Sequence, residues 1–120
     1  MRAGLCGLFI LVALPLGARE RLTLRVYPSV SFAPANLVVR AMVEADANNR
    51  AIEIVAESAD FYRSSQIELD GDKAPRTTMF EFRSLPQGTY EVRANLIGAG
   101  RQQRAWVRQQ INVIAGGAGQ

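Results

Sequence analysis

The 120-residue sequence is 48% hydrophobic and carries 14 basic and 11 acidic side chains, with both signs scattered along the chain. Because it has no basic tract, the clustered charge that marks nucleic-acid or anionic-membrane partners is missing. The sequence also has no histidine, which removes the commonest general base, proton shuttle and metal ligand from its chemistry.

The first 18 residues have the three parts of a secretory signal peptide. Arg2 supplies an early positive charge, residues 5–16 are almost all apolar, and small residues precede the charged Arg19-Glu20. A membrane-spanning helix needs roughly 20 apolar residues, so this stretch is too short to span. We therefore expect cleavage after Ala18 and a secreted or periplasmic chain without a membrane span; an uncleaved anchor is the alternative.

Cys6, the only cysteine, lies near the start of the apolar stretch, whereas a lipoprotein signal carries its cysteine at the end. Removing residues 1–18 from the 120 leaves 102 residues, with 13 basic and 11 acidic side chains because Arg2 is lost. That length suits one domain with one core. The mature chain would have no cysteine, so we expect neither a disulfide nor a thiolate metal ligand.

From residue 21 onward the apolar residues recur at every second position, in short runs that Pro, Gly, Asn and Asp interrupt. Evenly spaced short strands with turn residues between them predict an all-β sandwich or barrel. The seven expected strands are Leu22–Tyr27, Asn36–Glu44, Ala51–Glu57, Ser65–Leu69, Thr77–Phe82, Thr89–Ile97 and Arg104–Ile114.

The alternation also predicts which side chains face the core. One face of the sixth run carries Tyr90, Val92, Ala94 and Leu96, and the other carries Glu91, Arg93 and Asn95. This pattern is typical of an antiparallel sheet with one buried and one solvated face. Residues 115–120 have no apolar anchor and predict a flexible Gly-rich tail after a sandwich domain spanning 19–114.

The segment Gly98-Ala99-Gly100-Arg101 predicts a hairpin between the last two strands. With Ala99-Gly100 as the loop, Gln103 and Gln109 fall on the inner face, where they lie beyond the core edge or mark a bulge. The same loop opposes Val92 to Val107, Ala94 to Ala105, Arg93 to Trp106 and Glu91 to Arg108.

The segment Leu85-Pro86-Gln87-Gly88-Thr89-Tyr90-Glu91-Val92 resembles the tyrosine corner of immunoglobulin-like and fibronectin type III-like domains. The resemblance implies a seven-stranded antiparallel sandwich in which the Tyr90 phenol bonds to nearby backbone. The antibody cysteine pair is absent and Trp106 lies in the last strand, so a bacterial-type sandwich fits better than an antigen receptor. Proteins with this fold have many different functions, so the fold does not by itself identify the function.

Two surface features are candidate binding sites. The first is an outward strip of Arg93, Arg104, Trp106 and Arg108 on the last hairpin. An exposed tryptophan beside arginines can stack on a sugar ring or anchor a protein interface. In the alternative, Arg93 covers the indole ring and the strip binds nothing. The second is the connection Ser58-Ala59-Asp60-Phe61-Tyr62-Arg63-Ser64, where we expect Phe61 to plug one end of the core and Tyr62 to lie on the rim.

Candidate chemistry is sparse. Asp70 and Asp72 lie two residues apart in a predicted turn. We expect both side chains to face solvent; the alternatives are a calcium site and a pair of carboxylates that cleaves a glycoside. We therefore predict that the chain is not an enzyme, has no cofactor or metal, and is an exported binding or accessory module. Its expected partner is another exported protein or a glycan, and no oligomeric state follows. The alternatives are a small secreted carboxylate-dependent hydrolase and a self-assembling subunit with exposed edge strands.

Overall fold

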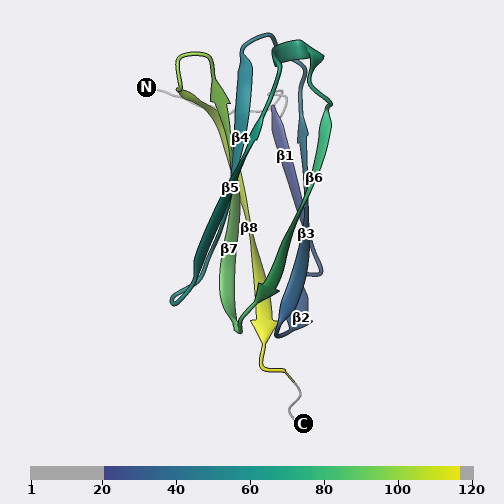
Figure 1. Cartoon of the computed structure of the whole chain (residues 1–120), viewed down its shortest axis with the longest axis vertical. Helices are drawn as coiled ribbons and strands as arrows, with labels where there is room; N and C mark the ends of the chain where they lie inside the picture. Colours follow the sequence, from purple (N-terminus) through teal and green to yellow (C-terminus); the bar gives the residue numbers. More distant parts are fainter. Residues whose placement is uncertain (1–20, 117–120) are drawn as a thin grey trace, which may run out of the picture.

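Two β-sheets lie face to face in the computed structural model, which describes residues 21–116 (Figure 1). The smaller sheet has the strand order β1-β3-β6, and the larger has the order β2-β8-β7-β4-β5. The elements are β1 (Leu22–Tyr27), β2 (Val30–Phe32), β3 (Ala35–Val43), β4 (Asn49–Glu57), β5 (Tyr62–Glu68), the 3₁₀ turn η2 (Gly71–Lys73), β6 (Thr77–Leu85), β7 (Gly88–Gly98) and β8 (Gln103–Ile114).

The predicted all-β class is confirmed, and no helix within residues 21–116 has the length and apolar character needed to cross a membrane. The predicted signal peptide, residues 1–18, lies outside the described residues, and so do the last four residues of the predicted tail.

The predicted number of strands is wrong, because residues 21–116 form eight strands where the sequence pattern predicted seven. The additional strand, β2, has only three residues and lies between Pro28 and Pro34. Val30 is 56% exposed and Phe32 62% exposed, so β2 does not show the alternation between core and solvent that identifies the longer strands. β2 also pairs in parallel with the end of β8, so the prediction of a wholly antiparallel sandwich is wrong.

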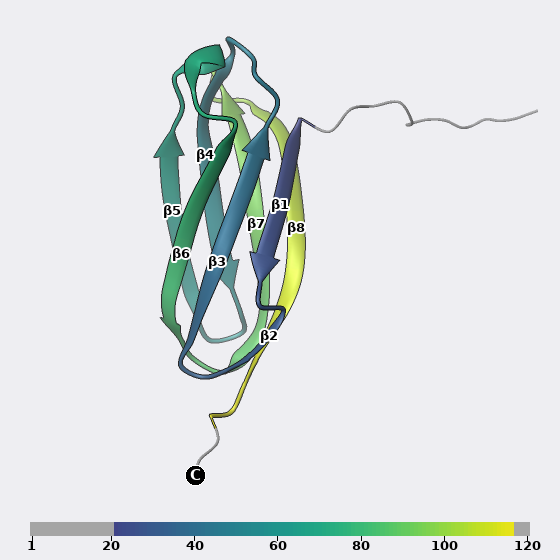
Figure 2. The ribbon, with the colours of Figure 1, turned by 90° about the vertical axis from the view of Figure 1, so that its right-hand side faces the viewer.

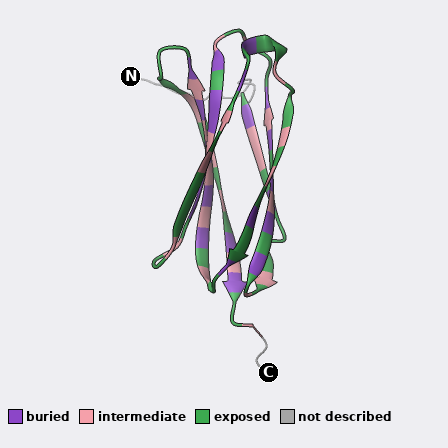
Figure 3. Ribbon diagram, viewed as in Figure 1, coloured by how far each residue is buried: buried purple, intermediate pink, exposed green. Residues whose placement is uncertain are grey.

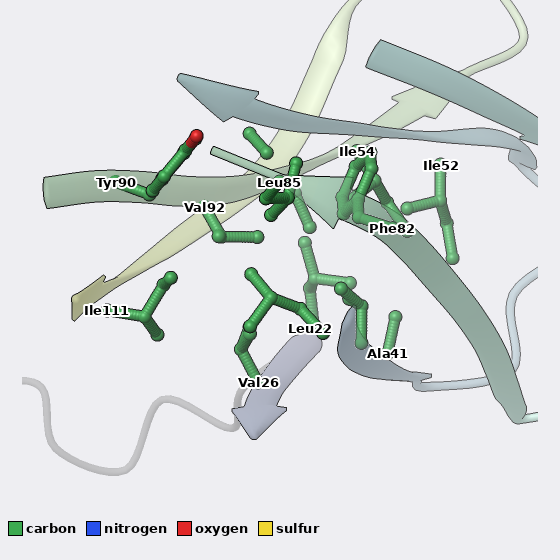
Figure 4. Packing of buried hydrophobic residues seen from close by; sticks show 14 of the residues in the cluster. Leu22, Val26, Ala41, Ile52, Ile54, Phe82, Leu85, Tyr90, Val92 and Ile111 are labelled. Atoms are coloured by element: carbon green, nitrogen blue, oxygen red, sulfur yellow. The ribbon is translucent and has the colours of Figure 1, made fainter. Parts of the chain in front are cut away.

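The core forms where the predicted alternation places it. Along β3, β4 and β7, side chains at every second position are buried between the sheets (Figures 3 and 4). The predicted inward sets are buried in full: Leu37, Val39, Ala41 and Val43 on β3, Ile52, Ile54 and Ala56 on β4, and Tyr90, Val92, Ala94 and Leu96 on β7. Both sheets therefore share one interior.

Tyr90 secures the entry to β7. Its side chain is fully buried, and its hydroxyl donates a hydrogen bond of 2.7 Å to the carbonyl of Pro86, as predicted. Burial raises the pKa of the Tyr90 phenol, which keeps it a neutral donor. The ring of Phe61 packs edge-on against Tyr90 with 6.1 Å between centroids, whereas Tyr62 is 58% exposed, so both predictions for this pair are confirmed.

Replacing Tyr90 by phenylalanine is expected to lower the free energy of unfolding by about 1 kcal/mol, because the hydrogen bond to Pro86 is lost while the ring remains packed. Urea denaturation measures this change. The matched control is Tyr62→Phe, which removes the same hydroxyl from a position that is 58% exposed, and it should leave stability unchanged. Equal effects of the two substitutions would contradict the role of the phenol.

Gln109 joins the two sheets where β1 and β8 lie side by side (Figure 2). Its amide oxygen accepts from the Val26 backbone N–H at 3.0 Å, and its amide nitrogen donates to the Val26 carbonyl at 2.8 Å. The inward direction predicted for Gln109 is therefore correct, but the residue fills the gap between sheets instead of lying beyond the core. Gln103 is exposed and pairs with Ile97 at the register shift of the hairpin.

The predicted register of this hairpin is wrong by two residues. Val92 pairs with Gln109 and not with Val107, because the connection is longer than Ala99-Gly100. The Gly98 N–H donates to the Gln102 carbonyl at 2.9 Å, and Arg101 adopts a φ of 64° within the loop. A slip of two residues keeps each side chain on its predicted face, since the period of a strand is two. The observed pairs are Ala94–Val107, Leu96–Ala105, Arg93–Arg108, Asn95–Trp106 and Glu91–Gln110.

Candidate ligand-binding face

The outward side chains of β8, β7, β4 and β5 form the outer surface of the larger sheet, opposite the core; Val55 among them is only 2% exposed. Cross-strand neighbours form three rows: Trp106–Asn95–Glu53–Gln66, Arg108–Arg93–Val55–Ser64 and Gln110–Glu91–Glu57–Tyr62. We call one part of this surface the Trp106 face; it consists of Glu57, Glu91, Arg93, Trp106, Arg108 and Gln110.

A chain of ion pairs crosses the Trp106 face. Arg93 donates to Glu91 at 2.8 Å and to Glu57 at 3.2 Å, while Arg108 donates to the second carboxylate oxygen of Glu91 at 3.1 Å. The hydrogen bond from Arg93 and the contact with Arg108 hold the pKa of Glu91 below its ordinary value. Glu91 is therefore a charged acceptor between two guanidinium groups at neutral pH.

Trp106 remains 49% exposed beside these ion pairs. The guanidinium of Arg108 lies 5.6 Å from the centroid of its ring, within the range of a cation–π contact. The prediction that Arg93 covers the ring is wrong, because the register places Arg93 opposite Arg108 and its guanidinium binds Glu57 and Glu91 instead. The indole thus keeps accessible apolar surface next to charged groups that are already paired.

Arg104 is drawn away from the rest of the predicted strip. Its side chain is only 11% exposed and donates to Asn49 at 2.6 Å and to Asp46 at 3.1 Å. Gly98 makes this path possible, since a Cβ there would lie 2.9 Å from the Cδ of Arg104. The Asn48 backbone N–H and Arg104 together lower the pKa of Asp46. Arg104 therefore holds the loop before β4 and contributes little free surface.

Tyr62 shares the outward surface of the sheet but lies on its far edge strand, β5, in the row that contains Glu57 and Glu91. Of the five residues predicted for binding, the structure thus brings Arg93, Trp106 and Arg108 together, places Tyr62 across the sheet and separates Arg104.

A groove of about 660 Å³ lies against this face. It runs between the loop residues Ser58-Ala59 and the outward side chains of Glu91, Arg108 and Gln110, with Glu57 also in its wall. Ser58 and Ala59 belong to a candidate binding segment predicted from the sequence, but Glu57 and Gln110 were not selected, although the alternation already put Glu57 on an outward face. The missing information was the strand order, which makes β4 and β8 the two neighbours of β7.

Asp70 and Asp72 lie apart from this groove, next to and within η2, and both are exposed, as expected for a solvated turn. Gly71 between them has a φ of 55°, and a Cβ there would lie 2.9 Å from the Ala47 carbonyl oxygen, so the turn requires glycine. Within residues 21–116, no group of three or more histidine, cysteine, aspartate or glutamate side chains is arranged to hold a metal ion.

No family model and no curated protein matches this sequence. Among solved structures, the chain is similar to a superoxide reductase (neelaredoxin) from Ignicoccus hospitalis, with 16% identity, a TM-score of 0.63, and coverage of 78% of this chain and 80% of that one. It is also similar to part of a family 76 glycoside hydrolase from a bovine Bacteroides thetaiotaomicron strain, with 21% identity and a TM-score of 0.55. That match covers 77% of this chain and 20% of the hydrolase.

The first of these similarities corrects the prediction that the chain is not an enzyme. The structurally similar superoxide reductase is an enzyme, so the sandwich cannot serve as a reason to exclude catalysis. At these identities the likeness establishes the fold alone, and no specific activity follows from it.

Proposed function

We propose that this chain is an exported binding module of immunoglobulin-like or fibronectin type III-like topology, and that the Trp106 face binds its ligand. The observation that carries the proposal is the half-exposed indole of Trp106 in contact with Arg108, which also lines a groove whose charged side chains are already held in place. A tryptophan with accessible surface next to ordered polar groups suits a ligand with both apolar and polar parts.

The ordering of the face supports a binding role. Glu91 is fixed through both carboxylate oxygens, and Arg93 is fixed by two carboxylates from different strands. Side chains that are already immobilised lose little conformational entropy when a ligand arrives, so binding energy is not spent on ordering them. A sheet also holds these groups more rigidly than a loop does.

The immunoglobulin-like assignment is supported by the strand arrangement and by the tyrosine corner. Three strands, β1-β3-β6, face a sheet containing β8-β7-β4-β5, and Tyr90 bonds back to Pro86 at the start of β7. The short strand β2 adds to the free side of β8 and leaves that order intact.

Export is supported by the signal-like residues 1–18. When the full chain is expressed with a C-terminal tag in a bacterial host, the mature product should be recovered outside the cytoplasm with Arg19 as its first residue. Intact-mass spectrometry of the periplasmic and medium fractions measures this. A full-length product retained with the cells would contradict export.

Binding can be tested at Trp106, because it is the chain's only tryptophan and the peptide that contains it can be followed by mass spectrometry. When residues 19–120 are mixed with fractions of native envelope or medium, an active fraction should protect Trp106 from chemical oxidation. Arg108→Ala should weaken that protection, whereas Met79→Ala, at an exposed position on the opposite sheet, should not. If neither protein nor glycan fractions protect Trp106, the proposed function is overturned.

A further inference from the structure

We infer that the ligand of the Trp106 face is an uncharged oligosaccharide, an inference that rests on the proposed function. Its first support is charge balance. The face contains two arginines and two glutamates that neutralise one another: Arg93 pairs with Glu57 and Glu91, and Arg108 pairs with Glu91. The third arginine of the strip, Arg104, is paired with Asp46.

This balance decides between ligand classes. A phosphate, a nucleic acid or an acidic peptide is attracted by an excess of positive charge, and a basic peptide by an excess of negative charge. A face whose charges cancel attracts neither class of charged ligand, whereas a neutral ligand does not need an excess of charge in order to bind. Its hydroxyl groups can still accept from the guanidinium groups and donate to the carboxylates without breaking the ion pairs, since each group has further hydrogen-bonding positions.

The second support is the combination of one flat apolar ring with polar neighbours. The half-exposed indole can stack on the C–H face of a sugar ring. Two amides on the same surface offer donors and acceptors for hydroxyl groups: Asn95 lies opposite Trp106, and Gln110 lies four residues further along β8 in the groove wall. A buried apolar side chain of a protein partner would require an apolar pocket, whereas the walls of this groove are mostly polar.

The third support concerns ligand size. The groove volume of about 660 Å³ lies within the roughly 300–1,000 Å³ of small-molecule sites. Tyr62, 58% exposed on β5, lies three strand spacings from β8, roughly 14 Å across the sheet, and it is also displaced from Trp106 by four residues along the strands, roughly another 14 Å. A ligand that contacts both Trp106 and Tyr62 must therefore be longer than one sugar unit, which favours an oligosaccharide.

The test uses residues 19–120 and short soluble oligomers of neutral hexoses, pentoses and N-acetylhexosamines in α and β linkage, with oligogalacturonate and heparin fragments as charged probes. Saturable protection of Trp106 from acrylamide by at least one neutral series, and by neither charged probe, is the expected result. Calorimetric titration should then show binding about tenfold weaker for Trp106→Ala. Met79→Ala on the opposite sheet should bind like the natural chain, which separates a local effect from misfolding.

The outcomes separate the two claims. Protection by a protein fraction alone, or strongest protection by a charged saccharide, overturns the inference about the ligand and leaves the binding role of the face intact. Absence of protection by every saccharide and by every native fraction overturns the inference and the proposed function together.

Discussion

Replacing Phe82 by alanine is expected to lower the free energy of unfolding by about 3–5 kcal/mol. Phe82 lies on β6, is 1% exposed, and packs edge-on against Phe80 with 4.9 Å between ring centroids. It belongs to the cluster that both sheets share, which also includes Ile54 of the larger sheet (Figure 4). The substitution removes a large apolar group from this closed interior and leaves a cavity there. Urea denaturation followed by circular dichroism measures the loss.

The control for this prediction is Phe32→Ala, which removes the same side chain from a position on β2 that is 62% exposed. Its effect should stay within about 0.5 kcal/mol, because little apolar surface returns to water. If the two phenylalanines are equally costly to remove, the assignment of the core is incorrect.

Replacing Gln109 by alanine is expected to lower the free energy of unfolding by about 2–4 kcal/mol, a large effect for a single polar side chain. The backbone N–H and carbonyl of Val26 both lose their partner, and Val26 is only 4% exposed. Each unsatisfied buried group costs about 1–3 kcal/mol. Gln110→Ala is the matched control, because its neighbouring amide faces outward and is exposed.

A second substitution, Gln109→Glu, gives this prediction a pH signature. An ionised glutamate can accept from the Val26 N–H but repels the Val26 carbonyl, whereas the protonated form can donate to it. The folded state therefore raises the pKa of the new carboxyl. Protonation of this carboxyl stabilises the folded state at low pH, and that stabilisation is lost as the pH rises through the raised pKa. Relative to the natural chain, the variant should recover stability as the pH falls. A constant or widening deficit would contradict the bridging role.

Local alternation was enough to predict the long strands and their buried faces, because the direction of a side chain along a strand depends only on its position in the sequence. The hairpin register was not predictable in the same way, since it depends on how Gly98 and Arg101 shape the loop. β2 was missed because its exposed side chains obey no two-residue pattern. The partner of Gln109 lies 83 residues earlier, and no local pattern identifies it.

The candidate site was predictable in part for the same reason. Trp106 and Arg108 were recognised as outward residues of one strand, and a two-residue error in register leaves that direction unchanged. Glu57 could be joined to them only through the order β8-β7-β4, which is a property of the whole sheet. The prediction that Arg104 belongs to the same surface patch was wrong. Gly98 leaves room for the Arg104 side chain to reach Asp46 instead.

Cysteine accessibility along β7 tests the central claim most directly, namely that alternation between the shared core and the outer surface creates the Trp106 face. Residues 19–120 contain no cysteine, so single cysteines can be placed at positions 91 to 96 without background. Thiol labelling of the folded protein should be fast at 91, 93 and 95, and slow at 92, 94 and 96 until the protein unfolds. Uniform labelling, or protection that recurs every three to four residues as on a helix, would contradict the sandwich and the face built on it.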